Sequence, residues 1–486
     1  MDRSKRIIAV GVAGLMLLIA AACGQKPNVA LQAGGGALPA GFAVNEEGEV
    51  VNTATGEVVG SAEDLLGTDS GLGGDTAVGG TTISGGEGSV AEGEEAGGGT
   101  TGAAPPPTSG GDTTGITDDT IKIGIHAPLT GAAPVPSDSV EKGKDLFFRW
   151  MAEEKKITLF GRTVEVVLKN DQYNPSTAVS VCKEMVEKDK VFLLSGAAGT
   201  DQIQACARYA ASVGVPYIGA GVTELVLNQL PNFFATSMTY NDQGPLLADM
   251  LVSDLGAKNE KNGMLTFETP NFEDARQGFR DGMKRMGATI HYERTVSKGS
   301  GTSEARTVVQ EMSTAGIENV FVLTSPVWWL NVLKQADTQQ YNPQWVGVGI
   351  SMTFDTVASV GCGGGNSIDG AKFFSPFPAY IDSNRYDTEF RAASAKFYPQ
   401  KTPDDFMWLS WSGSKVLWDM FKGVGDNLSR EAFIYEVERM RGLKQGIGPV
   451  LNYSPDDHFG ANEVHVSEAR CSDRRWHTIK SFASDF

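Results

Sequence analysis

Two short loops of small residues are the features of this sequence most suited to binding a ligand. The first, Ser195–Gly199, follows the apolar run Val191–Leu194 and precedes a helical pattern that starts near Thr200. The second, Gly219–Gly221, follows the apolar run Val215–Ile218. Small side chains leave backbone N–H groups open, and a helix start favours a negatively charged group. The chemistry expected here is noncovalent binding of a polar or anionic solute, unless the small residues serve only close packing of a helix on a strand.

Motifs of catalysis are absent from the sequence or stand in the wrong context. It contains no H-E-x-x-H, G-x-S-x-G or G-x-x-x-x-G-K motif. A G-x-G-x-x-G pattern at Gly97, Gly99 and Gly102 has no strand before it and no helix after it. The pattern S-x-x-K occurs at 412–415 and 139–142. Because only two of its four positions are fixed, this pattern occurs by chance in most chains of this length. We therefore predict no enzyme and no catalytic residue, with an exported hydrolase as a remote alternative.

Four cysteines lie beyond the N-terminal region, at Cys182, Cys206, Cys362 and Cys471. They form no C-x-x-C pair and no Cys/His spacing typical of zinc sites, so we predict no metal and no cofactor. In an exported chain an even number of cysteines indicates disulfides, and four cysteines allow three pairings. We prefer Cys182–Cys206, which would join adjacent helices, together with Cys362–Cys471. Free buried thiols are the alternative.

The first residues have the layout of an export signal. Arg3, Lys5 and Arg6 precede the apolar run Ile7–Ala20, and small residues then lead to Cys23. A cysteine at this point resembles a bacterial lipoprotein signal, in which Cys23 would be lipidated, although Ala20 stands where that motif usually has leucine. The alternatives are an ordinary cleaved signal and a transmembrane anchor, for which the run is short. We expect a cell-membrane location on the extracytoplasmic face.

The whole chain has 486 residues and a formal net charge of −18. Such acidity disfavours nonspecific binding to nucleic acid, because phosphate would be repelled. Residues 25–115 are rich in Gly, Thr, Ala and Ser, with no Lys or Arg between Lys26 and Lys122. This composition cannot bury enough apolar surface to fold, and it predicts a disordered tether. About 90 residues of such coil would span roughly 50 Å.

The folded part shows strands and helices in alternation, and the alternation occurs twice. The first series begins with the strand pattern Thr120–Ile125 and continues through the two loops described above to the run Phe233–Thr236. After Gln243–Pro245 the pattern begins again and runs to a strand at Gln344–Val348. Alternation of this kind predicts two α/β lobes, each with a parallel sheet. Near the end, 450–453 and 463–468 alternate like two antiparallel strands.

The order of several segments resembles a known family, the type I solute-binding proteins of ABC importers in the leucine/isoleucine/valine-binding group. The resemblance covers about 121–477. The segments that carry it are Ile123-Gly124 with Thr130-Gly131, Asp171 with Asn174-Pro175, 196–200, 214–218, Asp242-Gln243-Gly244, 271–278, and Gly448-Pro449 with 456–460. No single motif is decisive, but their order and spacing are consistent throughout.

The resemblance implies a type I periplasmic-binding-protein fold, with two Rossmann-like lobes joined by three crossings. It also implies a monomer that captures a small organic solute in the cleft, closes about a hinge and docks on a permease. A ligand-sensing receptor component of the same fold is the alternative. The predicted boundaries are a signal at 1–22, a tether at 23–118, lobe one at 119–241 and 372–426, and lobe two at 242–371 and 427–486.

In such a fold the cleft wall is built by loops at strand ends. The residues predicted to line it are Thr130, Ala198, Gly199, Thr200, Gly219, Gly221, Phe272, Pro326, Trp328, Ser351, Phe406 and Trp411. Thr200 would donate a hydrogen bond from its hydroxyl, and the aromatic residues would supply apolar surface. For each aromatic residue the alternative is the core of a lobe.

The resemblance also bears on the solute. Amino-acid-binding members hold the α-ammonium with an acidic side chain after a lobe-two strand, and the matching stretch here, Gly347–Ser351, has none. The family's first-lobe serine is replaced by Ala or Gly, and a threonine by Gly221 or Val222. Burying an ammonium without a counter-charge costs several kcal/mol. We therefore expect a small carboxylate, amide or aromatic solute rather than leucine, unless Glu268 or Glu224 supplies the missing charge.

Overall fold

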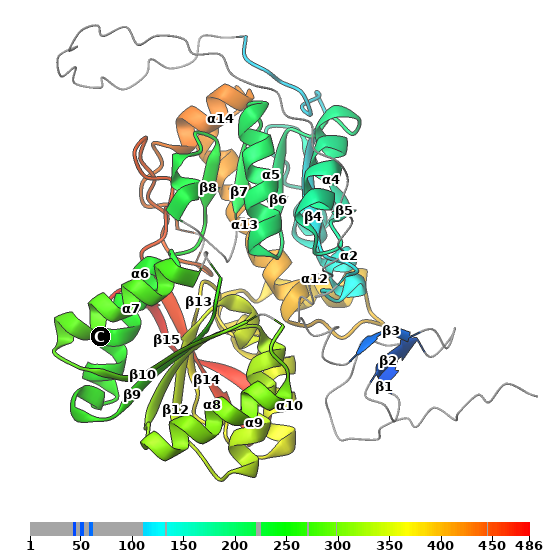
Figure 1. Ribbon diagram of the computed structural model, residues 1–486. Coiled ribbons are helices and arrows are strands. Elements are labelled where there is room, and N and C mark those ends of the chain that lie inside the picture. Colours follow the sequence, from blue (N-terminus) through cyan, green and yellow to red (C-terminus); the bar gives the residue numbers. More distant parts are fainter. Residues whose placement is uncertain are drawn as a thin grey trace, which may run out of the picture.

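The computed structural model describes residues 42–44, 49–52, 58–61, 110–131, 134–219, 225–269, 272–297, 299–444 and 446–486. Ahead of the lobes, the backbone forms a small antiparallel sheet of β1 (Phe42–Val44), β2 (Glu49–Asn52) and β3 (Val58–Ser61). The two lobes that follow each contain one sheet (Figure 1). Within the described residues no helix is both long and apolar enough to cross a bilayer.

Lobe one is built on a five-stranded parallel sheet in the order β5-β4-β6-β7-β8. The strands are β4 (Thr120–Ala127), β5 (Thr163–Asn170), β6 (Leu193–Gly196), β7 (Tyr217–Gly219) and β8 (Phe233–Ala235). Successive residues of the buried strands enter different cores, so that Tyr217 and Phe233 pack on one face while Ile218 and Phe234 pack on the other. A strand that is apolar on both faces is expected when helices cover both sides of a parallel sheet.

Helices cover both faces of this sheet. They are α2 (Ser137–Gly143), α3 (Leu146–Arg149), α4 (Pro175–Glu187), α5 (Thr200–Ser212), α12 (Glu389–Phe397), α13 (Asp405–Val424) and α14 (Arg430–Val437), with a π-helical segment at Trp150–Lys155 and a 3-10 segment at Leu225–Gln229. The side chain of Asn174 caps α4 by accepting from the Thr177 N–H, and Pro175 occupies the first turn. In the same way, Asp404 caps α13 by accepting from the Met407 N–H.

Lobe two has a seven-stranded sheet in the order β10-β9-β11-β12-β13-β14-β15. Its parallel strands are β9 (Asn262–Phe267), β10 (Ile290–Val296), β11 (Asn319–Leu323), β12 (Gln344–Val348) and β13 (Lys372–Ser375). β14 (Val464–Arg470) runs antiparallel to β13 and to β15 (Arg475–Ala483). The predicted strand at 463–468 is confirmed as β14, but 450–453 is not its partner: β14 pairs with β13 and β15, and Leu451 forms isolated bridges with Leu443 and Ala461.

The helices of lobe two lie on both faces of its sheet as well. They are α6 (Tyr240–Asp249), α7 (Glu273–Met286), α8 (Thr302–Ala315), α9 (Pro326–Thr338), α10 (Asp355–Gly364) and α11 (Ser383–Tyr386), with a π-helical segment at Met250–Asp254 and 3-10 segments at Ala257–Asn259, Ile350–Thr353 and Tyr380–Asp382. Ser325 caps α9 by accepting from the Trp328 N–H. Gly287 and Gly316 end α7 and α8 in the left-handed conformation.

The lobe boundaries differ from the predicted ones at two places. We predicted that Lys372 begins the return to lobe one, but β13 pairs with β12 and β14 in the sheet of lobe two. We also assigned residues from Asn427 onward to lobe two, but Arg430 of α14 donates to the carbonyl oxygens of Val191 and Phe192 in lobe one. The chain thus crosses between lobes after β8, after β13 and before β14, which makes three crossings.

Both preferred cysteine pairs are disulfides in the structure. Cys182 of α4 and Cys206 of α5 are bonded within lobe one, with Cα atoms 6.1 Å apart. Cys362 of α10 is bonded to Cys471, which follows β14, with Cα atoms 5.3 Å apart. Each disulfide therefore joins elements of a single lobe. Among the described residues, no disulfide joins one lobe to the other.

Candidate functional site

The loops that follow the parallel strands of the two sheets meet where the lobes adjoin (Figure 1). Two pairs of residues illustrate this contact. The Leu225 N–H lies 3.4 Å from Asp274 Oδ2, and the rings of Phe354 and Phe406 are 4.5 Å apart. Within lobe two, the rings of Tyr240 and Phe272 are 6.2 Å apart beside these pairs. In open α/β sheets ligands bind beyond the carboxyl ends of strands, so this junction is the candidate solute site.

In lobe one, Asn170 ties the loop after β4 to the loop after β5. Its Oδ1 accepts from the N–H groups of Leu129, Thr130 and Gln172, at 3.0, 3.2 and 2.9 Å. Its Nδ2 donates to the Thr130 hydroxyl at 2.7 Å. Gly131 has a φ of +105°, and a Cβ there would lie 2.1 Å from the Gln172 carbonyl oxygen, so only glycine fits. These contacts present Thr130 as an exposed, oriented group at the rim.

The loop after β6 presents the first turn of α5. Gly199, with a φ of +84°, precedes this helix and supplies no side-chain cap. The backbone N–H groups of the first turn point out of the helix start, which is where an anion binds most favourably. Ala198, Gly199 and Thr200 are all partly exposed here. This turn is therefore the described element of lobe one best suited to a carboxylate.

Beneath these loops lies a chain of three fully buried polar side chains. His126 Nδ1 is 2.8 Å from Asp171 Oδ2, and His126 Nε2 is 2.7 Å from the Tyr217 hydroxyl. Burial, and next the charge of Asp171, raise the pKa of Tyr217 well above its usual range, so the phenol keeps its proton. The phenol then donates to Nε2, and the ring proton on Nδ1 is donated to Asp171.

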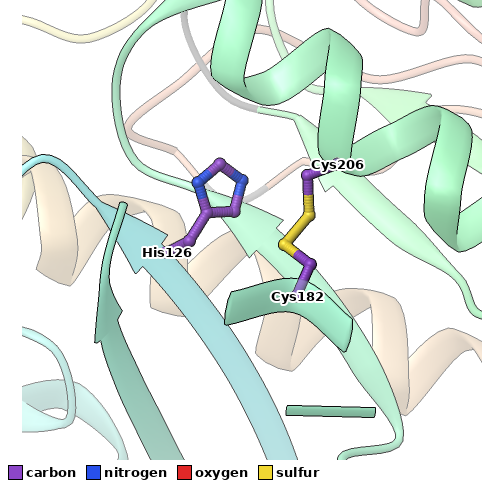
Figure 2. Close-up of side chains that lie close together, drawn as sticks. All are labelled: His126, Cys182 and Cys206. Carbon is purple, nitrogen blue, oxygen red and sulfur yellow. A yellow bond between two sulfur atoms is a disulfide. The ribbon is translucent and has the colours of Figure 1, made fainter. Parts of the chain in front are cut away.

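His126 also lies near two sulfur atoms, and the arrangement superficially resembles a metal site. The ligand atoms of His126, Cys182 and Cys206 are within 4.8 Å of one another, but Figure 2 shows the two sulfurs joined in a disulfide. A disulfide offers no thiolate, and both ring nitrogens of His126 already have partners. These residues do not form a metal centre while the disulfide is intact.

In lobe two, a buried arginine holds the loop after β9. Arg276 of α7 donates to the carbonyl oxygens of Phe267 and Thr269, at 2.7 and 3.3 Å, and to the Thr266 hydroxyl at 3.2 Å. Its Nε donates to Glu273 at 2.7 Å. These bonds position the backbone that leads to Phe272, and Arg276 is only 6 % exposed, so its charge serves the loop rather than a solute.

Two carboxyl groups from different lobes meet at one edge of the junction. Asp355 is the first residue of α10 and Asp405 the first of α13, and Asp405 Oδ2 accepts from the Asp355 N–H at 3.1 Å. Asp355 also accepts from the Trp476 N–H and lies 3.3 Å from Arg475. Burial and the neighbouring Asp355 raise the pKa of Asp405 well above its usual range. Burial likewise raises the pKa of Asp355.

Replacing Asp405 by asparagine should raise the melting temperature at pH 7 but not at pH 4. A carboxyl with a raised pKa in the folded state stays protonated where the unfolded chain has ionised. The contribution of Asp405 to wild-type stability is therefore lost as the pH rises from the pKa of this carboxyl in the unfolded chain, about 4, through its pKa in the folded protein. Asparagine does not ionise and still accepts from the Asp355 N–H. Melting curves at both pH values measure the difference, with Asp456→Asn, at an exposed turn, as control; an equal shift at both pH values contradicts the prediction.

The twelve predicted wall residues fall into four groups. Thr130, Ala198, Gly199, Thr200, Phe272, Pro326, Ser351 and Phe406 lie on loops or helix starts at the junction and are at least partly exposed. Trp328 and Trp411 are 0 % exposed and lie in the lobe cores, against Phe267 and Phe147, which corrects their assignment to the wall. Gly219 is buried in β7 with the Phe233 ring against it. Gly221 lies outside the described residues, as does Cys23, the residue predicted to be lipidated.

Three junction residues were not predicted. Tyr240 and Phe354 pack against Phe272 and Phe406, and Tyr173 lies beside Gly199, where a Cβ would be 3.3 Å from its ring. Tyr240 lies two positions before the Asp242-Gln243-Gly244 crossing motif, and Tyr173 falls between Asp171 and Asn174-Pro175. Tyr240 and Tyr173 are thus close to motifs that the sequence revealed, whereas Phe354 is not. The contact between the lobes, however, is not visible in sequence.

The chain matches the family model described as periplasmic binding protein over residues 120–474. No curated protein sequence matches it significantly. Among solved structures, a leucine-binding protein of Thermotoga maritima is 18% identical with a TM-score of 0.61, covering 74% of this chain and 98% of its own. A branched-chain amino acid ABC transporter protein of Thermus thermophilus with bound valine is 16% identical with a TM-score of 0.62, covering 76% and 98%.

A third solved structure is a solute-binding protein of an ABC transporter from Rhodopseudomonas palustris, in complex with 3,4-dihydroxybenzoic acid. It is 21% identical with a TM-score of 0.60, covering 76% of this chain and 99% of its own. At these identities the likeness establishes the fold, and the bound molecules belong to those proteins.

Proposed function

Because the chain belongs to the periplasmic binding protein family, we propose that it captures a small organic solute between its two lobes and delivers it to an ABC importer. The observation that carries this proposal is the meeting of strand-end loops from both sheets at a junction spanned by three crossings. Lobes connected only through such crossings can close about a hinge and trap a solute. A closed pair of lobes presents a surface to the importer that the open pair does not.

We further propose that the solute carries a carboxylate or amide on an apolar or aromatic body. The first turn of α5 suits an anion, and Phe272, Tyr240 and Phe406 bring aromatic rings to the junction. The stretch Gly347–Ser351 carries no acidic side chain to hold an ammonium group. Relatives in complex with 3,4-dihydroxybenzoic acid and with benzoate support a solute of this class.

The test is a thermal-shift screen of amino acids against their deaminated analogues, aromatic acids and amides. A ligand at 100 times its Kd should add about 2.7 kcal/mol to the free energy of unfolding. Thr200→Ala should weaken binding of the best solute about fivefold, because one hydrogen bond is lost. Ser212→Ala, at the other end of α5, is the matched control and should change nothing. Sub-micromolar binding of leucine, isoleucine or valine would overturn the solute class, and no hit in any class would count against the function.

We also propose that Cys23 is lipidated and anchors the protein to the outer face of the cell membrane. The charged start, the apolar run Ile7–Ala20 and the small residues before Cys23 support this. Cys23→Ser should move the protein from the membrane fraction to the soluble fraction, as judged by immunoblotting after fractionation. A variant that stays as firmly bound as the parent contradicts lipid anchoring and favours an uncleaved membrane segment.

A further inference from the structure

We propose that the buried chain Asp171–His126–Tyr217 is the positioning network of the solute site, aligning two of its loops without touching the solute. This inference rests on the proposed function. All three side chains are 0 % exposed, so none of them can contact a solute directly. His126 lies at the carboxyl end of β4, Asp171 directly follows β5, and Tyr217 begins the short strand β7, which β6 separates from β4 in the sheet.

One end of the network sets the position of Tyr173. Asp171 Oδ1 accepts from the Tyr173 N–H at 2.9 Å, while its Oδ2 is held by His126 at 2.8 Å. Tyr173 has a φ of +54°, a conformation that is uncommon for a residue with a large side chain and must be imposed by its surroundings. The Asp171 side chain provides that constraint, and it thereby places the Tyr173 ring beside Gly199 at the start of α5.

The other end of the network supports the loop after β6. A Cβ on Gly196 would lie 2.3 Å from the Tyr217 hydroxyl and 2.9 Å from His126 Nε2, so this glycine rests directly on the hydrogen bond between them. The next residue, Ala197, donates its N–H to the His126 carbonyl oxygen at 3.0 Å. The path of the chain into the first turn of α5 therefore depends on where the His126–Tyr217 pair sits.

The chemistry of the network makes its parts interdependent. Tyr217 donates to His126, which donates to Asp171, which accepts from Tyr173, so each group is correctly placed only if the next one is. A buried polar group that loses its hydrogen-bond partner destabilises the folded state. The His126 imidazole would then turn or shift to find another hydrogen-bond partner. Removing the Tyr217 hydroxyl should thus loosen both the loop after β5 and the loop after β6.

The experiment compares two buried tyrosines by amide hydrogen exchange, without any solute. Tyr217→Phe removes the network hydroxyl, and Tyr453→Phe removes a hydroxyl of equal burial that donates to the Ala235 carbonyl oxygen at 3.0 Å. In peptides covering 171–175 and 196–201, Tyr217→Phe should speed exchange about fivefold to tenfold over wild type. Tyr453→Phe should leave these peptides unchanged. Equal exchange in the two variants at matched melting temperatures would overturn the proposal.

A second variant separates hydrogen bonding from charge. In Asp171→Asn the amide oxygen can still accept from Tyr173, and the amide N–H2 can donate to His126 Nδ1. The imidazole then carries its proton on Nε2 and donates to Tyr217. The number of bonds within the chain is kept while the carboxylate charge is removed, but the Tyr217 O–H loses His126 as its acceptor, so exchange in both peptides should rise less than in Tyr217→Phe. Exchange as fast as in Tyr217→Phe would show that charge, not the bonded chain, holds the loops. Because no solute is used, failure here is distinct from failure of the proposed function.

Discussion

Replacing Cys362 and Cys471 together by alanine should lower the free energy of unfolding by about 4 to 5 kcal/mol, the largest effect we expect from the loss of one pair of side chains. The two residues are 109 positions apart, and the chain-entropy cost of an unfolded loop grows with its length. The bond joins α10 to the turn after β14, so the loop that it closes contains both later crossings between the lobes. Urea unfolding monitored by circular dichroism measures the change.

The second disulfide provides the comparison. Cys182 and Cys206 are 24 positions apart, and the same relation gives about 3.4 kcal/mol for their loss. The two bonds lie in different lobes, so the effects of the two double replacements should add in the quadruple variant. An equal or larger loss for the Cys182–Cys206 pair would contradict loop length as the dominant cause, and would point instead to packing around these two fully buried side chains.

Replacing Arg430 by methionine should lower the free energy of unfolding by about 3 kcal/mol. Arg430 is 5 % exposed, and it donates to the carbonyl oxygens of Val191 and Phe192 at 2.7 and 3.0 Å. It also pairs with Asp112. Methionine keeps much of the apolar volume but removes the hydrogen bonds that the guanidinium donates to these two carbonyl oxygens. The measurement is urea unfolding at pH 7.

The same variant should also release the first described residues of the folded part. Asp112 is held by Arg430, whose backbone N–H donates to the Asp112 carbonyl oxygen at 2.9 Å, and by Glu431. Limited proteolysis should therefore cut near Asp112 sooner in Arg430→Met. Arg441→Met is the control, because Arg441 is exposed and donates only to nearby carbonyl oxygens. Wild-type stability in Arg430→Met would show that water replaces the arginine at no cost.

Local chemistry explains what could be predicted from the sequence. Buried parallel strands appear as short apolar runs, helix starts are marked by capping residues such as Asn174 and Ser325, and small residues mark the loop into α5. These signals arise within a few residues of each other, so the two alternating series and most of the junction loops could be found from sequence. The two disulfide pairs also agreed with the preferred pairing.

Only the tertiary structure decided which sheet a strand joins and which way a side chain points. The run Phe373-Phe374 is apolar on both faces and would suit either sheet, so its pairing with β12 and β14 depends on contacts far along the chain. Trp328 and Trp411 follow the same pattern as Phe272 and Phe406 but turn into the cores, because the space beneath each helix must be filled. His126 meets partners 45 and 91 positions away. The sequence by itself determined the elements and their order; folding alone determined the partners, since hydrogen bonds and burial act between residues that only three-dimensional packing brings together.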